Sequence, residues 1–533
     1  MEAPAGHKII TEGQGSIIFS ESNEVFYNNV QELNRDLSIE FIKLFAEKRL
    51  REKEERTIKK ATPKGEEPDY SVLDEVDWTE KCKETASEDG VVILDALAAT
   101  ALRSCRYAKE IPGVKKIVIN DLDEAAIEAA KKNIEFNKIP ESMIETHITD
   151  ANLFMYQNLG KFDVVDIDPY GSGSPHIDAA VQAVANGGLL CFTCTDLAVL
   201  SGGNVTACFA KYGSMPTKGK YLHEMALRIV LHALETSATR YRRTIIPLAS
   251  LAIDFYVRVF VKVIESKAAV QDSCLKRGYV YQSVGCPNFY LQPMARKPKN
   301  NVYACAHGPV SGEKCPDTGK EFKIGGPIWT EPIHDVEFVK EIIQRLESKK
   351  GPFTPGTETR MHGLLTAVSE ELQDVPLFYN LPDLCSTLHC ESPRLPNFKA
   401  ALINAGYRAS HFHKDASAVK TDAPPQMIWD ILRCWIKKHP INKKRLKPDS
   451  FAQIILSKEP EHQADFALPK QLRPRSIKKA KRFLPNPESY WGPKSRARGK
   501  RACLEENSDQ MSNKETEVTE STMQESKENN TPS

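Results

Sequence analysis

The sequence has 533 residues, of which 41% are hydrophobic and 27% charged, and its 72 lysines and arginines nearly balance 71 acidic residues. This length predicts two to four domains, and no apolar run approaches the roughly 20 residues that cross a bilayer, which excludes an integral membrane protein. Thirteen scattered cysteines are typical of a reducing compartment, and the first residues resemble no secretion signal, so secretion is not expected.

The first part of the chain predicts helix and linker. Residues 47–68 are saturated with charge and carry no apolar stripe, which indicates a solvated helix end followed by a linker. We therefore treat residues 1–90 as an N-terminal extension with a charged linker that packs on the domain that follows.

From residue 91 onward, short β-branched runs alternate with helical periods, which indicates βαβ units and a parallel sheet. We expect strands at 91–94, 116–119, 145–148, 162–167, 188–193 and 248–264, and helices at 123–137, 176–185 and 222–239. The predicted fold class is α/β, with a doubly wound, Rossmann-type domain at 91–265 and an α+β domain at 266–465.

Acidic residues follow the first three predicted strands, at the edge where such sheets bind ligands. The small-residue loop 95–103 lets a ligand approach the backbone, but it lacks the GxGxxG motif that cradles a pyrophosphate. Asp121 suits ribose hydroxyls and Asp150 an adenine amino group, while the alternative role for Asp121 is a helix N-cap, which Asp123 suits better. Carboxylates repel phosphate but tolerate a sulfonium, so this set favours S-adenosylmethionine as the cofactor.

The fourth strand ends in Asp168-Pro169-Tyr170-Gly171, which predicts the reaction centre. An exocyclic base amine is a poor nucleophile because its lone pair is delocalised into the ring. The Asp168 carboxylate and the Pro169 carbonyl are able to accept its two N–H bonds and align the lone pair, and Tyr170 to stack on the base. The alternative is a buried aspartate that caps the next turn.

Two arginines complete the predicted pocket. Arg103 lies in the first loop, where its guanidinium suits the methionine carboxylate, and Arg35 precedes the sheet and is placed to close over the site. For Arg35 taken alone, a surface ion pair is the alternative.

Taken together, the motifs resemble the tRNA guanine-26 N2-dimethyltransferases, in a metazoan-like form, over about residues 8–490. The matching text, in chain order, is residues 13–19, Phe26-Tyr27-Asn28, Asn34-Arg35-Asp36, residues 94–103, Asn120-Asp121, Asp168-Pro169-Tyr170-Gly171, Cys194-Thr195-Asp196, residues 325–329 and residues 420–424. The resemblance implies cofactor contacts at Arg35, Arg103, Asp121, Asp150 and Ala151, with Asp168 at the catalytic centre. It also implies that the second domain binds tRNA.

Two departures from the family pattern are visible. Ala101 stands where the family usually has glycine, which predicts a tighter loop or a negative φ there. Animal relatives carry paired CxxC motifs, whereas here Ser283 and Thr318 replace one cysteine of each pair and leave Cys286 and Cys315. Tetrahedral zinc needs four ligands, so we expect no metal.

Basic runs predict contact with nucleic acid near the C-terminus. Residues 470–501 hold twelve lysines and arginines against Glu488, residues 437–447 add a second basic run, and Phe483, Tyr490 and Trp491 are interleaved. Such runs bind phosphate, and they also serve as nuclear import signals or solvated faces. After this basic segment, which begins near residue 466, the acidic tail 505–533 is typical of disorder.

Together with this resemblance, the sequence predicts a tRNA N2-methyltransferase that acts on guanosine 26, with tRNA as partner and no DNA or membrane. The expected location is the nucleus, with the mitochondrion or the cytoplasm as the alternatives. One alternative is amino-methylation of another RNA base or of an amide. The other is a tRNA-binding protein whose transferase site has decayed.

Overall fold

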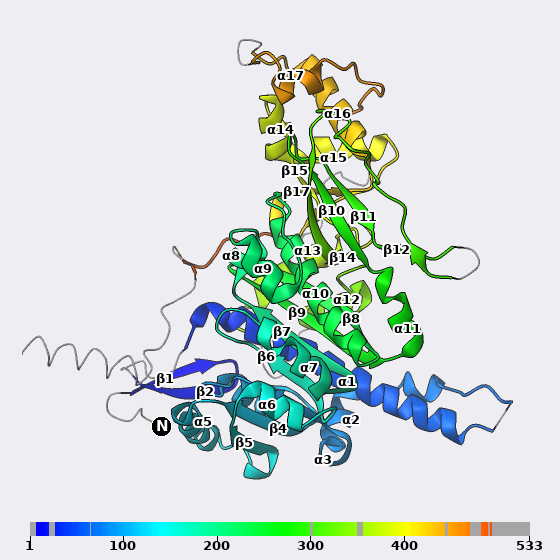
Figure 1. Ribbon diagram of the computed structural model, residues 1–533. Coiled ribbons are helices and arrows are strands. Elements are labelled where there is room, and N and C mark those ends of the chain that lie inside the picture. The colour runs from blue at the N-terminus through cyan, green and yellow to red at the C-terminus, as the bar shows by residue number, and fades with distance from the viewer. Residues whose placement is uncertain are drawn as a thin grey trace, which may run out of the picture.

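The computed structural model describes residues 7–20, 27–63, 65–298, 302–348, 355–442, 446–469, 481–488 and 491–492. A seven-stranded sheet in the order β5-β4-β3-β6-β7-β9-β8 forms the centre of the lower part in Figure 1. Its strands are β3 (Val91–Asp95), β4 (Val114–Asp121), β5 (Ile144–Ile148), β6 (Phe162–Ile167), β7 (Val184–Cys194), β8 (Arg243–Ile253) and β9 (Tyr256–Glu265). The first five run parallel, which confirms the expected Rossmann-type arrangement, and β9 and β8 complete the sheet in antiparallel pairs.

Helices cover both faces of this sheet, which explains why its strands are apolar on both sides. One face packs against α1 (Glu32–Ala61), α4 (Leu102–Glu110), α5 (Glu124–Phe136), α12 (Val336–Ser348) and α13 (Glu358–Ser369). The other face packs against α6 (Ala151–Gln157), α7 (Ile177–Ala183) and α10 (Leu222–Arg240). Asp123 caps α5 by accepting from the backbone N–H of Ala125, as the sequence predicts.

The expected long strand at 248–264 is wrong, because the chain reverses there. β8 ends at Ile253, β9 begins at Tyr256, and Asp254 between them has a φ of 43°. Both strands are buried, so their apolar residues run together in the sequence and hide the turn. Asp254 and Phe255 form this β8–β9 turn.

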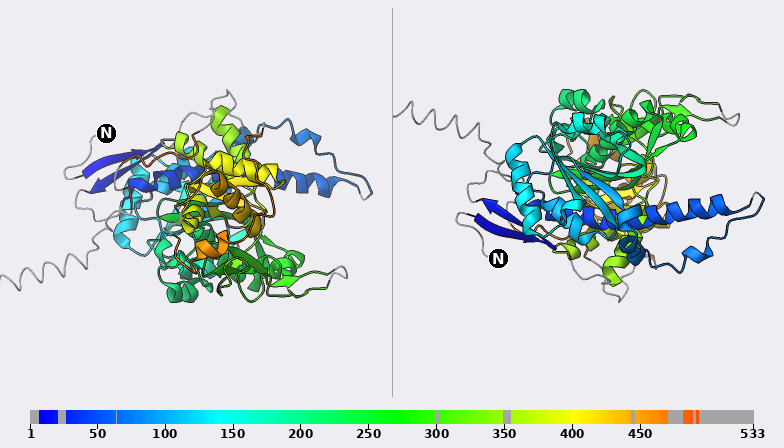
Figure 2. Two further views of the ribbon diagram at one scale, coloured as in Figure 1. Left: turned by 90° about the horizontal axis from the view of Figure 1, so that it is seen from above. Right: turned by 90° about the horizontal axis from the view of Figure 1, so that it is seen from below.

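Helix α1 is longer and more buried than its charge pattern predicts. It continues to Ala61, and Glu47 and Leu50, inside the expected solvated segment, are buried. Glu47 accepts hydrogen bonds from Arg345 of α12, a partner that lies far away in the sequence. Figure 2 shows α1 running beside the sheet, with its C-terminal end projecting beyond it.

Among its described residues, the second part contains two three-stranded antiparallel sheets, besides a two-stranded one. One has the order β11-β10-β14, from β10 (Arg277–Ser283), β11 (Phe289–Pro293) and β14 (Phe322–Trp329), and the other has the order β15-β17-β16, from β15 (Tyr379–Asn380), β16 (Ala409–Phe412) and β17 (Asp415–Thr421). Around them lie α14 (Leu381–Leu388), α15 (Leu395–Asn404), α16 (Pro425–Lys438) and α17 (Phe451–Leu456). The two parts share a core, since α12 and α13 return to the large sheet and Trp329 packs in the same cluster as α10.

The remaining elements are short: β1 (His7–Glu12), β2 (Gly15–Ser20), α2 (Trp78–Glu84), α3 (Ala86–Asp89), α8 (Leu197–Leu200), α9 (Val205–Tyr212), α11 (Lys267–Gln271), β12 (Ala295–Arg296) and β13 (Ala304–Cys305). The β1–β2 hairpin docks on α5, where Asn133 and Asn137 accept from its backbone N–H groups. Among the described residues, none of the helices combines the length and apolar character of a bilayer span.

Candidate active site

A cavity of about 400 Å³ opens at the carboxyl edge of the large sheet. Five predicted site residues line it, namely Arg35, Arg103, Asp168, Pro169 and Tyr170. The rest of its wall consists of Tyr27, Asn28, Gln31, Asp95, Leu97, Ala98, Ala99, Thr100, Leu102, Gly171, Thr195, Asp196 and Phe255. A larger cavity of about 480 Å³, between residues 218–221 and the second part beside α14 and α17, contains none of the predicted residues.

Asp121, Asp150 and Ala151 lie at the same edge of the sheet but outside the wall of this cavity. The Asp121 carboxylate accepts from the backbone N–H groups of Ala99 and Asp123, at 2.9 and 3.1 Å. Asp150 caps α6, accepting from two backbone N–H groups at 3.0 Å, and Ala151 is buried in the first turn of that helix. Both carboxylates therefore have structural roles in addition to any ligand role.

The loop after β3 adopts the left-handed conformation at two alanines. The φ of Ala99 is 47° and that of Ala101 is 56°, so a negative φ at Ala101 is wrong. Asp121 bonds the N–H of Ala99, and the carbonyl of Ala101 begins the hydrogen bonding of α4 by accepting from Cys105. These bonds hold the alanines in a conformation that favours glycine.

Arg103 joins the cavity to a buried charge network. Its guanidinium donates to Ser38 at 3.0 Å, to Asp166 at 3.2 Å and to the carboxylate of Asp168. Asp168 is thereby held at the cavity wall with one side facing a fixed positive charge.

Asp166 is the fully buried centre of that network, and sequence reasoning missed it. Arg258 of β9 donates to both its carboxylate oxygens at 2.8 Å, and the Tyr107 hydroxyl donates to it at 2.5 Å. Burial raises the pKa of Asp166, but Arg103 and Arg258 outweigh it and lower the pKa to about 2. Asp166 lies two residues before the predicted motif, on a position of β6 whose neighbours are all apolar and which therefore looks like part of the core.

Among the carboxylates that line the cavity, Asp95 at the end of β3 has the pKa that departs furthest from its ordinary value. Burial raises its pKa to about 7, although Arg103 and a 2.6 Å hydrogen bond from Ser104 act in the opposite direction. Asp95 therefore titrates near neutral pH.

Arg35 is buried in an ion pair and is not the surface residue of the alternative reading. It donates to both oxygens of Glu12 at 2.6 Å and to the carbonyl of Asn28 at 2.9 Å. Glu12 lies on β1, 23 residues earlier, and no local pattern identifies it as a partner. The β1–β2 hairpin thus fixes the orientation of Arg35 at the cavity.

The Asp168-Pro169-Tyr170-Gly171 loop is tied to the end of β7. Thr195 accepts from the backbone N–H of Gly171 at 2.8 Å through its hydroxyl, and its own N–H donates to the Gly171 carbonyl at 2.8 Å. The Tyr170 side chain is 54% exposed at the cavity. These ties place a carboxylate, a proline carbonyl and an aromatic ring together at one wall.

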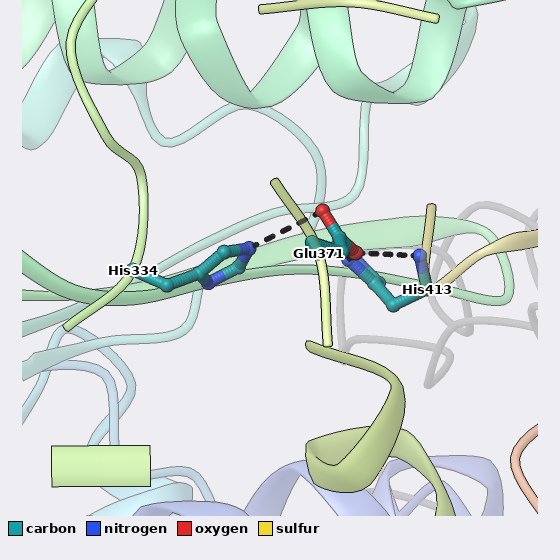
Figure 3. A group of neighbouring side chains, drawn as sticks. All are labelled: His334, Glu371 and His413. Carbon is teal, nitrogen blue, oxygen red and sulfur yellow. Dashed lines mark hydrogen bonds and ion pairs between the residues drawn. The ribbon is translucent and has the colours of Figure 1, made fainter. Parts of the chain in front are cut away.

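A second group of titratable side chains lies between the two parts of the molecule (Figure 3). His413 donates from Nδ1 to Glu371 at 2.7 Å, and the His334 Nε2 atom faces Glu371 at 3.9 Å. On their far sides, the backbone N–H of Ala252 donates to His413 Nε2 at 2.9 Å and that of Ser250 donates to His334 Nδ1 at 3.2 Å. Since a backbone N–H only donates, each ring must carry its proton on the nitrogen that faces Glu371.

This arrangement does not suit a metal ion. To bind a metal here, each imidazole would have to lose the proton from the nitrogen that faces Glu371. The Lys420 ammonium, 3.5 Å from Glu371, already supplies a positive charge to that carboxylate. Burial lowers the pKa of His334 to about 3, so its ring stays neutral. The group instead connects β8 to the second part, a role for His413 that the sequence does not indicate.

The residual cysteines are neighbours. Cys286 and Cys315 are buried with their sulfur atoms 3.7 Å apart, and Ser283 lies 3.5 Å from the Cys286 sulfur. Hydrogen bonding to Cys286 and Ser283 lowers the pKa of Cys315, against the effect of burial. Ser283, at one of the two positions where a second cysteine is missing, thus places its hydroxyl beside the pair.

Much of the predicted basic segment, including residues 470–480 and 493–501, lies outside the described residues. The described strap, residues 481–488 and 491–492, returns to the large sheet. Arg482 forms an ion pair with Glu370, and Trp491 Nε1 donates to Asp254 at 3.0 Å.

Comparison with known proteins identifies relatives along nearly the whole chain. Residues 6–433 match the family model of N2,N2-dimethylguanosine tRNA methyltransferases. A tRNA (guanine(26)-N(2))-dimethyltransferase of Arabidopsis thaliana is 44% identical over 92% of this chain and 89% of its own, and the Homo sapiens enzyme of that name is 42% identical over 97% and 82%. The solved Trm1 of Pyrococcus horikoshii, in complex with S-adenosyl-L-methionine, has the same fold, with a TM-score of 0.62 and 24% identity over 79% of this chain and 98% of its own.

Proposed function

The chain belongs to the N2,N2-dimethylguanosine tRNA methyltransferase family, and from that premise we propose that it transfers one or two methyl groups from S-adenosylmethionine to the exocyclic N2 of guanosine 26 in tRNA. The observation that carries the proposal is the placement of Asp168, Pro169 and Tyr170 together in the cavity at the carboxyl edge of the sheet. A carboxylate, a carbonyl and an aromatic ring are what a base amine needs for binding and orientation.

The residues around the cavity suit S-adenosylmethionine. Arg103 and Arg35 supply guanidinium groups for its carboxylate, and the cavity volume falls in the range of small-molecule sites. Asp121 and Asp150 follow the next two strands along the same edge, where they suit the ribose hydroxyls and, with Ala151, the adenine. When bound, this cofactor supplies an electrophilic methyl group on a positively charged sulfur.

Asp168 and Pro169 act on the acceptor nitrogen. The carboxylate and the proline carbonyl accept its two N–H bonds, which draws the nitrogen toward tetrahedral geometry and directs its lone pair outward. The lone pair would form the new N–C bond as the bond between that methyl carbon and the sulfur breaks, so that S-adenosylhomocysteine leaves as a neutral thioether. Asp168 accepts the proton that the nitrogen loses. For a second transfer, one acceptor remains sufficient because only one N–H is left.

The alternative activities have weaker support. Methylation of another base or an amide fits the Asp-Pro-Tyr motif equally well, but the relatives that match across the chain carry the guanine-26 name. Decay of the transferase site is disfavoured because Arg103, Asp166 and Asp168 form a complete charge network.

Nucleoside analysis tests the proposal. The protein is incubated with S-adenosylmethionine and unmodified tRNA, and the nucleosides are identified by mass spectrometry. We expect N2-methyl- and N2,N2-dimethylguanosine from wild-type tRNA and neither from tRNA that carries adenosine at position 26. A different methylated nucleoside would assign the enzyme to another acceptor.

The second domain and the basic segment are proposed to bind the tRNA, and the basic segment to direct the protein to the nucleus. Support comes from the excess of lysine and arginine in residues 470–501. A relative from Saccharomyces cerevisiae is named a mitochondrial enzyme, so a mitochondrial form is the alternative location. Fluorescence of a tagged chain with and without residues 470–501 distinguishes the two.

A further inference from the structure

The β8–β9 turn lies at the same edge of the sheet as the proposed reaction centre. β9 runs antiparallel to β7, with Val257 opposite Cys194, and Ile253 is opposite Tyr256 across the hairpin. The turn residues Asp254 and Phe255 therefore stand beside the carboxyl end of β7, where Thr195 and Asp196 line the cavity.

Phe255 lines that cavity on the side of β7 and β9. The order of strands is β3, β6, β7, β9. Arg103, in the first turn of α4 and not in the loop before it as expected, and the turn that carries Phe255 therefore lie on opposite sides of the Asp168 loop. The Phe255 ring is half-buried and packs edge-on against Tyr256 at 5.5 Å between ring centres. Phe255 therefore lines the same cavity as Asp168 and Tyr170.

The second part of the molecule and the C-terminal strap hold this turn from outside. Arg360 of α13 donates to both oxygens of Asp254 at 2.8 and 2.9 Å, and Trp491 of the strap donates to it at 3.0 Å. Lys414 adds a positive charge at 3.7 Å. The Asp254 side chain is thus buried among positively charged or donor groups from three separate segments of the chain.

The strand that leads into the turn is held in the same way. His334 and His413 accept from the backbone N–H groups of Ser250 and Ala252 on the outer edge of β8. β8 is the last strand of the sheet, so these N–H groups face the second part and no further strand. The position of Phe255 consequently depends on the contact between the two parts.

From these contacts we propose that Phe255 packs against the target guanine, and that Asp254 is a positioning residue through which the second domain and Trp491 hold that ring in place. This inference rests on the proposed function. It explains why a carboxylate with a left-handed φ is kept in a hairpin turn, where its charge is satisfied only by distant segments.

Substitution of Phe255 tests the base contact. We expect Phe255→Leu to lower kcat/KM for tRNA about 10- to 100-fold, the range of one base–aromatic contact, and Phe255→Tyr to stay within about threefold of wild type. Calorimetric affinity for S-adenosylmethionine should not change. Phe136→Leu, at a half-buried phenylalanine of α5 outside the cavity, is the matched control. Wild-type kcat/KM in Phe255→Leu overturns the proposal, whereas absence of N2-methylation by the wild-type protein overturns the proposed function itself.

A double-mutant cycle tests the positioning role. Asp254→Asn keeps a residue that tolerates the turn but removes its charge, and Trp491→Phe keeps an aromatic ring but removes the donor. Each should lower kcat/KM several-fold, and neither should lower it further in the Phe255→Leu background. Additive losses would mean that Asp254 and Trp491 act through general stability, and would overturn this role. Trp491→Phe gives the answer alone if Asp254→Asn does not fold, as judged by thermal denaturation.

Discussion

Arg103 and Asp168, 65 residues apart, form a direct ion pair inside the proposed active site. The same guanidinium also bonds Asp166 beneath the cavity, so the arginine links the catalytic carboxylate to the core of the sheet. A residue expected to bind the cofactor therefore also orients the residue expected to bind the base. Because of this ion pair, the expected effects of substitutions at Asp168 and at Arg103 on methyl transfer and cofactor binding depend on the contacts that each residue makes with the other.

Asp168→Asn should reduce methyl transfer about 10²- to 10⁴-fold, the usual contribution of a group that accepts a proton. The amide keeps the size of the side chain but cannot take the proton from the base nitrogen. Single-turnover methylation of tRNA measures the effect. Because Arg103 keeps its bond to Asp166, the melting temperature should change little, and full activity of the variant would place the reaction centre elsewhere.

Arg103→Lys should weaken S-adenosylmethionine binding by at least about tenfold. A lysine ammonium retains the charge, but it lacks the planar fork that reaches Ser38, Asp166 and Asp168 together. Isothermal titration with the cofactor measures the affinity. Arg49→Lys, at an arginine paired with Asp163 away from the cavity, is the control, and equal affinities in all three proteins would contradict the assignment.

Asp95 should make the protein less stable as the pH rises. Its folded pKa of about 7 lies above the unfolded value near 4, so the native state binds the extra proton between these limits. The contribution of the Asp95 carboxyl to the free energy of unfolding is fully present below pH 4 and is lost as the pH rises through 7. The free energy of unfolding differs between these two limits by up to about 4 kcal/mol. Urea unfolding of wild type and Asp95→Asn from pH 5 to 8 should give curves that diverge, with wild type losing relative stability. Parallel curves would show that Asp95 ionises normally.

Ala99→Gly should raise the free energy of unfolding by about 0.5 kcal/mol. Glycine removes a left-handed strain of about 1–2 kcal/mol, which exceeds its entropic cost of about 0.5–1 kcal/mol. Ala129→Gly, within helix α5, should instead lower that free energy by about 1 kcal/mol. Chemical denaturation measures both free energies of unfolding. If both variants lose the same amount, the left-handed φ of Ala99 does not strain the protein.

Neutralising Lys478, Lys479, Lys481 and Arg482 should weaken tRNA binding and flatten its salt dependence. Each phosphate contact contributes about 0.7 to 0.9 to the slope of log K against log salt, so several lost contacts are readily measured. Fluorescence anisotropy at several salt concentrations gives the slope. As a control for total charge, the Lys131 and Lys132 pair of α5, changed to alanine, is compared with a variant in which only the Lys478 and Lys479 pair is neutralised. An unchanged slope in the fourfold variant would leave only the nuclear import role for these residues.

Part of the site could be predicted from the sequence because it depends on local order. Asp95, Asp121, Asp150 and Asp168 each follow a parallel strand, and parallel strands bring their carboxyl ends to one edge whatever lies between them. Asp123 was predictable as a cap for the same reason, since a cap bonds to residues two or three positions away.

Long-range contacts decided the rest. Three side-chain pairs join distant parts of the chain: Glu12 with Arg35, Asp166 with Arg258 92 residues later, and Asp254 with Trp491 237 residues later. No periodicity in the sequence indicates such pairs. The β8–β9 turn was hidden because two buried strands read as one apolar run. Local sequence determined which chemical groups stand at the edge of the sheet. Only the packing of distant segments determined their charge partners, their pKa values and the position of Phe255. The reason is that burial and electrostatic fields arise from what surrounds a residue in space.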